Sequence, residues 1–416
     1  MIALSKRLVF GCLCALYLPG VAMADSSDSS DSLWVRWFQN QVHQHPKVVA
    51  AKEKMNAAFS IADSLEQPLY NPELETEFER EGDANNYQVG INQTVDWGDK
   101  RGIGKQMANA NRSAAEYDFT LTVQQQSAQS LQALIKWHAA NHQARLALKQ
   151  ENQLGTLLDL VKERQRAGDL GQVDAELTVL GLSQTFNTTA QALAQLKQER
   201  AHLRELLPDW SPESAQIPER IWLIDRGLPQ NSIKIPKWED EHPAVMAARA
   251  EWDGLQKMAE LASKKAKADP TFGIAGGKTD DENVLALTFS IPLNVRNNFN
   301  AEEKAAHQEA LAAEAQYQAI RRKKHYAIRA AYDVLQEYQQ RAKRWQDLMA
   351  GRSERSQNLL EKQWRSGDMS TTEYLLALQQ LTEGSASGIE LREQFQLAQI
   401  EWLFQTGKIN AALQPM

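Results

Sequence analysis

The chain has 416 residues and a formal net charge of −7, and 43% of its residues are hydrophobic, which makes it polar for its length. This acidic balance argues against nucleic acid as a partner, because a nucleic-acid surface needs an excess of cations. Both cysteines, Cys12 and Cys14, lie within residues 1–24. If that segment is removed, the mature chain has neither a disulfide nor a thiolate ligand for a metal.

Residues 1–24 have the pattern of a cleavable signal peptide. Lys6 and Arg7 precede an apolar run at 8–18, and small residues follow at 22–24,. The run is shorter than the ~20 residues of a spanning helix, which disfavours a retained membrane anchor. A lipid anchor at Cys12 is also disfavoured, because little apolar sequence precedes it. Cleavage would remove two cations and change the net charge from −7 to −9; no later window is long and uncharged enough for a transmembrane helix.

Residues 25–207 are interpreted as a first structural repeat, in which an initial helix is followed by two strands at about 73–80 and 87–97. Four glutamates occupy every second position of the first strand, and apolar side chains from Tyr87 to Trp97 alternate with polar ones in the second. Successive side chains of a strand point to opposite faces. The pattern therefore predicts a hairpin with one apolar and one polar face.

Two long helices are expected next, at about 99–166 and 172–207, because no proline occurs between Pro72 and Pro208 and good helix formers fill the gap,. A helix over 99–166 would be about 100 Å long at 1.5 Å per residue. No compact globule of this chain length has that diameter. The prolines then cluster in 208–241, which reads as a connector,.

A second repeat is expected at 242–407, with a tail at 408–416. His45-Pro46 recurs at 242–243, and the turn 166–170 recurs at 365–369, each about 198 residues later,. The predicted elements are strands at about 271–278 and 284–293 and long helices at about 298–365 and 371–406. The predicted fold is mainly α with a small β part.

The strands lead from geometry to function. Strands of about 8–11 residues with one apolar and one polar face suit tilted transmembrane strands that face lipid and lumen. A sheet in a bilayer must close, because an open edge leaves backbone groups unpaired. Four strands cannot close, so the chain is expected to oligomerise. Two copies give eight strands with a filled interior, whereas three give twelve and leave room for a channel.

On this interpretation the acidic ladder of the first strand faces water inside a lumen, where it would favour cations. The ladder consists of Glu73, Glu75, Glu77 and Glu79. The alternative is that these carboxylates are only the polar face of an ordinary half-buried sheet.

The layout resembles the TolC-type outer-membrane efflux family. The resemblance rests on the signal peptide, the two repeats, the helix start at 95–101 (Val-Asp-Trp-Gly-Asp-Lys-Arg) and the Arg-x-Gly-Asp turns at 166 and 365. The Asn-Pro-Glu-Leu start at 71–74 is similar to the branch of cobalt-zinc-cadmium efflux components. The resemblance implies a homotrimer with a twelve-stranded barrel in the outer membrane and an α-helical tunnel in the periplasm. It also implies a periplasmic adaptor protein and an inner-membrane pump, of the RND type, as partners.

The resemblance assigns roles to the helix turns. The adaptor-docking tips would be Arg166, Gly168, Asp169 and Leu170 with Arg365, Gly367, Asp368 and Met369. Alternatively, the glycines are simple helix ends that need a positive φ. A periplasmic gate would use Glu373 and, in the first repeat, Asp174. A second acidic gate layer is expected to be missing, because Leu376 stands at its position, and the alternative for Glu373 is an acid favoured by the helix dipole.

Other chemistry finds little support in the sequence. His138 and His142 have a spacing that can present two imidazoles to a metal, but no third ligand is evident,. No catalytic or phosphate-binding motif occurs, so neither an enzyme nor a cofactor is expected. The alternative to a conduit is a soluble periplasmic coiled-coil scaffold. Within the channel fold, metal-ion efflux, drug efflux and type I secretion stay open, and the acidic lumen favours heavy-metal cations.

Overall fold

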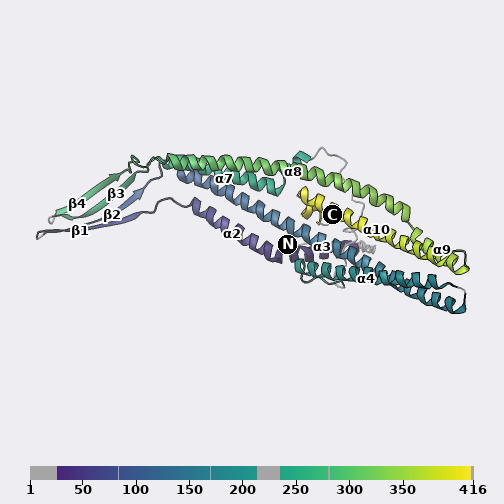
Figure 1. The fold of residues 1–416 in the computed structure, drawn as a ribbon. Coiled ribbons are helices and arrows are strands. Elements are labelled where there is room, and N and C mark those ends of the chain that lie inside the picture. The colour runs from purple at the N-terminus through teal and green to yellow at the C-terminus, as the bar shows by residue number, and fades with distance from the viewer. Residues whose placement is uncertain (1–25, 83, 169, 213–234, 280–281, 414–416) are drawn as a thin grey trace, which may run out of the picture.

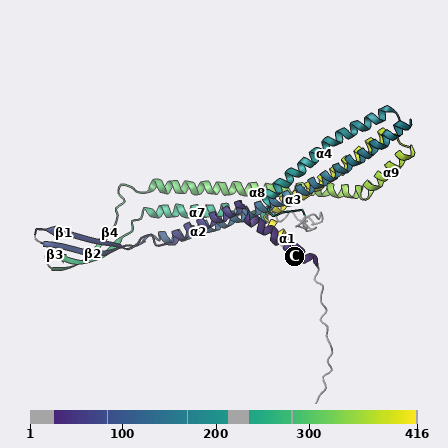
Figure 2. The same ribbon diagram turned by 90° about the horizontal axis from the view of Figure 1, so that it is seen from below.

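The computed structural model describes residues 26–82, 84–168, 170–212, 235–279 and 282–413. The molecule is elongated, with a small sheet projecting from one end and two helical hairpins side by side at the other (Figures 1 and 2). Among the described residues no helix is long and apolar enough to cross a membrane. The elements in chain order are α1 (Ser26–Gln44), α2 (Pro46–Glu66), β1 (Glu73–Glu81), β2 (Ala84–Thr94), α3 (Lys100–Ala167), α4 (Gln172–Leu206), α6 (Ile235–Asp240), α7 (Pro243–Lys265), β3 (Thr271–Thr279), β4 (Glu282–Ser290), α8 (Asn300–Met349), α9 (Arg352–Ser366), α10 (Thr371–Gln405) and α11 (Ile409–Ala412).

The repeated His-Pro dipeptide starts a helix in each half of the chain. The Nδ1 atom of His45 accepts a hydrogen bond from the backbone N–H of Lys47, and that of His242 accepts one from Ala244, at 3.3 and 3.1 Å. The proline that follows each histidine lies at the first helical position, where its missing N–H costs nothing,. Each imidazole thus acts as an N-cap, satisfying an N–H that has no partner within the helix.

Helix α3 runs for 68 residues without a break. Asp96 caps its start, because its two carboxylate oxygens accept from the backbone N–H groups of Lys100 and Arg101 at 2.9 and 2.8 Å. Gly168 ends it at φ 86°, in the left-handed region that a residue without Cβ enters at no steric cost,. The helix extends from the root of the sheet to the far tip of the molecule (Figure 1).

The single helix expected over 298–365 is wrong. α8 ends at Met349, and α9 starts only at Arg352. Between them Gly351 adopts φ 64°, and the chain changes direction there (Figure 2). No proline marks this break, and a glycine in the left-handed region ends the helix instead,.

Several smaller boundaries also differ from expectation. β2 ends at Thr94 rather than near 97, and β4 ends at Ser290 rather than near 293. The ranges expected as connector and tail contain the short helices α6 and α11. The expected signal peptide, most of the connector and the last three residues lie outside the described part of the chain.

Three buried clusters hold the helices together. The largest packs α1 on α3, with Phe38, Leu134 and Trp210 fully or almost fully buried. A second surrounds Trp402 where α6 and α8 meet α10. The third lies near the hairpin tips around Trp364. None of the three clusters contains a strand residue, so the sheet contributes nothing to the described core.

Candidate functional site

The four strands form one antiparallel sheet in the order β1-β2-β3-β4. Leu74 pairs with Ile91, Ile91 with Ile274, and Ile274 with Leu287. Because paired residues lie on the same side of a sheet, this register collects the large apolar side chains on one face, and Leu287 is 81% exposed there. The exposed apolar residues of this face are Leu74, Phe78, Tyr87, Val89, Ile91, Phe272, Ile274, Leu285, Leu287 and Phe289.

The opposite face of the sheet carries polar and small side chains. The register places all four glutamates of the ladder on it, with Glu75 opposite Gly90 and Glu77 opposite Gln88. Glu75 accepts a hydrogen bond from the side-chain amide of Asn92 at 2.7 Å. Small residues continue this face on β3 and β4, where Ala275 pairs with Ala286. The two faces of the sheet therefore suit two different solvents.

The sheet has two free edges within one chain. Among the described residues, β1 pairs only with β2, and β4 pairs only with β3. The sheet also projects beyond the helices, so that none of the helices in the described ranges covers its apolar face (Figures 1 and 2). An apolar face of this size on a soluble monomer is unusual and marks a protein or membrane contact.

At the root of the sheet, Asp269 joins the two halves of the chain. Its Oδ2 lies 2.8 Å from Lys100 Nζ and accepts from the Tyr70 hydroxyl at 2.7 Å, and its Oδ1 accepts from the Trp97 N–H at 3.3 Å. Burial raises the pKa of this carboxyl, but the hydrogen bonds from Lys100 and Tyr70 outweigh it and leave the pKa below its usual value. The bond to Asp269 in turn raises the pKa of Tyr70 to about 12. The carboxylate is thus held ionised as a clamp between α3 and β3.

The expected docking residues lie in the turns at the end opposite the sheet (Figure 1). Gly168 and Gly367 adopt φ 86° and 83°. Arg166 and Arg365 are exposed, whereas Leu170 and Met369 are half-buried. In the second turn, the side chain of Asp368 accepts from Ser366 Oγ at 2.7 Å. Asp169 lies outside the described residues, and no contact is assigned to it.

A contact that the sequence did not predict joins the two hairpins just behind these turns. The guanidinium of Arg164, on α3, lies over the ring of Trp364, on α9, at 4.8 Å. The same ring stacks on Tyr374 with centroids 5.2 Å apart, and its Nε1 donates to Thr371 Oγ1 at 3.2 Å. Both turns are therefore held by one buried aromatic cluster.

The expected gate residues occupy equivalent places in different surroundings. Glu373 closes a capping box at the start of α10: Ser370 Oγ accepts from the Glu373 N–H at 3.2 Å, and Glu373 accepts from the Ser370 N–H at 2.9 Å. The backbone and hydroxyl bonds from Ser370 lower the pKa of Glu373. Asp174 lies in the first turn of α4, whose N-cap is Gly171 and offers no side chain. Leu376 is 56% exposed.

The two histidines of α3 face each other. Their Nε2 atoms lie 3.2 Å apart. Burial lowers the pKa of His138 to about 4, assisted by His142 and by the charges of Arg392 and Arg145. Among the described residues, no group of three or more His, Cys, Asp or Glu side chains is placed to hold a metal ion.

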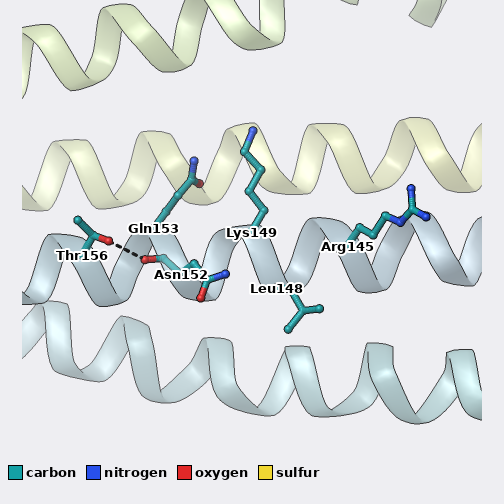
Figure 3. A pocket seen from close by; sticks show the side chains of 6 residues that line it. All are labelled: Arg145, Leu148, Lys149, Asn152, Gln153 and Thr156. Atoms are coloured by element: carbon teal, nitrogen blue, oxygen red, sulfur yellow. Dashed lines mark hydrogen bonds between the residues drawn. The ribbon is translucent and has the colours of Figure 1, made fainter.

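The side chains that line a shallow pocket on α3 do not form a catalytic or metal-binding arrangement. Six side chains of this one helix line it, without a carboxylate or an imidazole among them (Figure 3). Thr156 donates to the backbone carbonyl of Asn152 at 3.0 Å, and Lys149 reaches Gln357 at 3.2 Å. The lining residues are Arg145, Leu148, Lys149, Asn152, Gln153 and Thr156.

No protein-family model and no curated protein matches the sequence. Solved structures, however, match over nearly the whole chain. The Campylobacter jejuni CmeC outer membrane channel matches with a TM-score of 0.72 at 12% identity, covering 96% of this chain and 94% of its own. The Neisseria gonorrhoeae MtrE outer membrane channel, in its open state, matches with a TM-score of 0.71 at 13% identity, covering 90% and 88%.

A third similar structure is CusC, whose study concerns conformational changes on folding and transmembrane channel formation. It matches with a TM-score of 0.74 at 14% identity, covering 94% of this chain and 95% of its own. These similarities confirm the expected fold class, which is mainly helical with one four-stranded antiparallel sheet and is shared with TolC-like channels.

Proposed function

We propose that this chain is one subunit of an outer-membrane channel that passes solutes without an energy source of its own. The observation that carries the proposal is the projecting sheet, which has an exposed apolar face, a polar face and two free edges. Its strands of 9, 11, 9 and 9 residues match the 9–11 residues that a tilted strand needs to span a bilayer. The structural similarity to outer-membrane channels supports the same assignment.

The working unit would be a homotrimer with a twelve-stranded barrel. The order of the strands makes β4 of one copy antiparallel to β1 of the next, so both free edges can pair without a crossover,. Pairing of the edges removes the unpaired backbone groups that hydrocarbon does not tolerate. Twelve strands leave a lumen, whereas the eight of a dimer would be filled by side chains. The signal peptide would direct the chain to the outer membrane, with the helices in the periplasm.

In this assembly the acidic ladder lines the lumen and favours cations. Three copies would place twelve carboxylates, four per chain, around the pore wall,. Heavy-metal cations are therefore the substrate class that we favour, and drugs or secreted proteins are the alternatives. A deletion strain that becomes sensitive to zinc, cobalt or cadmium but not to dyes would support metal export; the reverse pattern would support drug export.

The hairpin tips would dock a periplasmic adaptor that links the channel to an inner-membrane pump of the RND type. Support comes from their place at the end opposite the sheet (Figure 1) and from the exposed Arg166 and Arg365. Glu373 and Asp174 would narrow the periplasmic mouth. Photo-crosslinkers at Arg166 and Leu170 should capture the adaptor in cells, whereas a crosslinker at Lys54, on the side of α2, should not.

The channel proposal is tested by reconstitution. The full chain should fractionate with the outer membrane, run as a heat-sensitive oligomer and conduct ions in a planar bilayer. Replacing the four ladder glutamates by glutamine should lower cation selectivity, and the single change Glu75→Lys should shift the reversal potential in the same direction. An unchanged reversal potential contradicts the lumen assignment. A soluble monomer without conductance contradicts the channel itself and favours the periplasmic scaffold.

A further inference from the structure

Two cations interrupt the apolar face of the sheet, and both lie at its hairpin end. Arg80 follows Phe78 by two residues on β1, and Lys278 follows Ile274 by four on β3, so both share the face of these apolar residues,. The neighbouring Glu79 points to the other face,. A charge on a lipid-facing surface is costly unless it reaches the head-group layer, so the position of these two cations calls for an anionic partner.

The register brings the two cations near one another. Phe78 pairs with Tyr87, and Tyr87 pairs with Lys278, so Tyr87 lies on the strand between the two cations. Arg80 and Lys278 are therefore two strand spacings apart, or roughly 10 Å, and offset by two residues, or roughly 7 Å along the strands. Arginine and lysine side chains are long and flexible, and both heads can reach one phosphorylated group from these positions.

Both cations are available for such a ligand. Arg80 is exposed and Lys278 half-buried, and neither forms an ion pair with another residue of the described segments. Tyr87 is also exposed and adds a hydroxyl between them. A guanidinium fork, an ammonium and a phenol form a donor set that suits phosphate oxygens.

At the opposite end of the sheet, the segments that follow β2 and β4 expose Trp97, Leu293 and Val295, at 72%, 77% and 85% exposure. Arg296, which comes directly after Val295, is exposed as well. Within the strands themselves the cations are Arg80 and Lys278, and each is the second-to-last residue of its strand, next to a hairpin turn.

We propose that Arg80, Lys278 and Tyr87 form a binding site for the phosphate group of a membrane lipid in the leaflet at the hairpin end. The inference rests on the proposed channel function, because it requires the apolar face to contact lipid. It adds to that function a lipid of defined chemistry, a phosphorylated head group, and a fixed depth of the sheet in the bilayer. The alternative is that both side chains only extend to the water at the membrane surface and bind no lipid phosphate.

The test uses the full chain in phosphatidylcholine nanodiscs, titrated with fluorescent lipid A or with the same glycolipid stripped of its phosphates. The wild type should prefer the phosphorylated lipid. The double variant Arg80→Gln/Lys278→Gln should bind it roughly thirtyfold more weakly, or roughly fivefold per cation. The control Lys162→Gln/Lys362→Gln removes two exposed cations near the hairpin tips and should bind like the wild type. Arg80→Lys should retain most of the affinity.

The outcomes separate the two levels of the proposal. If the wild type inserts and conducts but binds both lipids equally, or if the double variant binds like the wild type, the lipid site is overturned and the channel stands. If millimolar inorganic phosphate displaces the lipid, the site takes free phosphate, and its assignment to a lipid is overturned. If the wild type does not insert at all, both proposals fail together.

Discussion

The guanidinium of Arg164 lies 4.8 Å from the ring centroid of Trp364, and this contact ties the hairpin of the first half of the chain to that of the second. Trp364 is almost fully buried and touches three neighbours at once. Replacing it by alanine should destabilise the tips by roughly 3–5 kcal/mol, the usual cost of removing a buried aromatic. Hydrogen exchange should show faster exchange at both turns, and not only in α9.

Arg164→Gln provides the finer test of the same contact. It removes the cation but leaves the aromatic stack on Tyr374, so the expected loss is only about 0.5–1 kcal/mol. Arg166→Gln, which changes an exposed cation two residues further along, serves as the control. If hydrogen exchange in the second turn responds equally to both variants, Arg164 does not couple the hairpins.

Asp269→Asn should be strongly destabilising, because it leaves the buried ammonium of Lys100 without its counter-ion; breaking such a pair costs roughly 3–5 kcal/mol. The matched control is Asp63→Asn, which breaks an ion pair with Arg112 in which the carboxylate is well exposed, and it should cost no more than about 1 kcal/mol. Thermal unfolding of both variants checks this difference. Equal losses would contradict the role of Asp269 as a clamp.

The same pair makes stability depend on pH. The pKa of Asp269 in the folded protein is lowered, so its contribution is fully present above the ordinary carboxyl pKa and is lost as the pH falls through the lowered value. The melting temperatures of the wild type and of Asp269→Asn should therefore differ most at neutral pH and converge in acid. A constant difference across this range would show that the lost stability is not electrostatic.

Glu373 caps α10 and is also the residue proposed as the gate, and two substitutions separate these roles. Glu373→Gln keeps the side chain that can close the capping box but removes the charge, whereas Glu373→Ala removes both. If the charge closes the channel mouth, both variants should raise the conductance. If the residue only caps α10, the glutamine variant should conduct and melt like the wild type, and the alanine variant should melt lower.

Gly351→Ala tests the break between α8 and α9. Gly351 has φ 64°, a region that costs a residue with Cβ roughly 1–2 kcal/mol. The variant should melt lower or join the two helices, which circular dichroism would report as added helicity. Gly155→Ala, inside α3 with no atom within 4 Å of an added Cβ, should stabilise by roughly 1 kcal/mol. An equal gain at both positions would contradict the strained backbone at Gly351.

Much of the fold could be predicted from the sequence, because the alternation of side chains in the strands and the spacing of the prolines are clear. The alternation from Glu73 to Glu79 fixes which side chains share a face, and long stretches without proline predict long helices. The joint at Gly351 was missed because glycine inside a helical pattern is ambiguous. Gly155 and Gly181 lie within unbroken helices, and only the backbone geometry distinguishes Gly351 from them.

The site was less predictable, because its contacts join residues far apart in the sequence. The two repeats and the alternation of the strands do not show that Asp269 meets Lys100. The contact of Arg164 with Trp364 likewise depends on how the two hairpins lie side by side. The local sequence pattern of either hairpin does not predict that arrangement. The helix ends at Gly168 and Gly367 were easier to predict, because the signal for a helix end lies in neighbouring residues of the sequence.

The joint at Gly351 makes the two halves of the subunit mechanically unequal. One half has a single stiff rod from the root of the sheet to the tip, and the other has a rod with a joint about fifteen residues from its end,. A sideways load on the tips is borne by α3 along its whole length, whereas in the second half it falls on the joint and on the buried contact of Trp364 with Arg164. In the proposed homotrimer, each subunit would therefore bring one continuous helix and one jointed helix to the end of the molecule opposite the sheet.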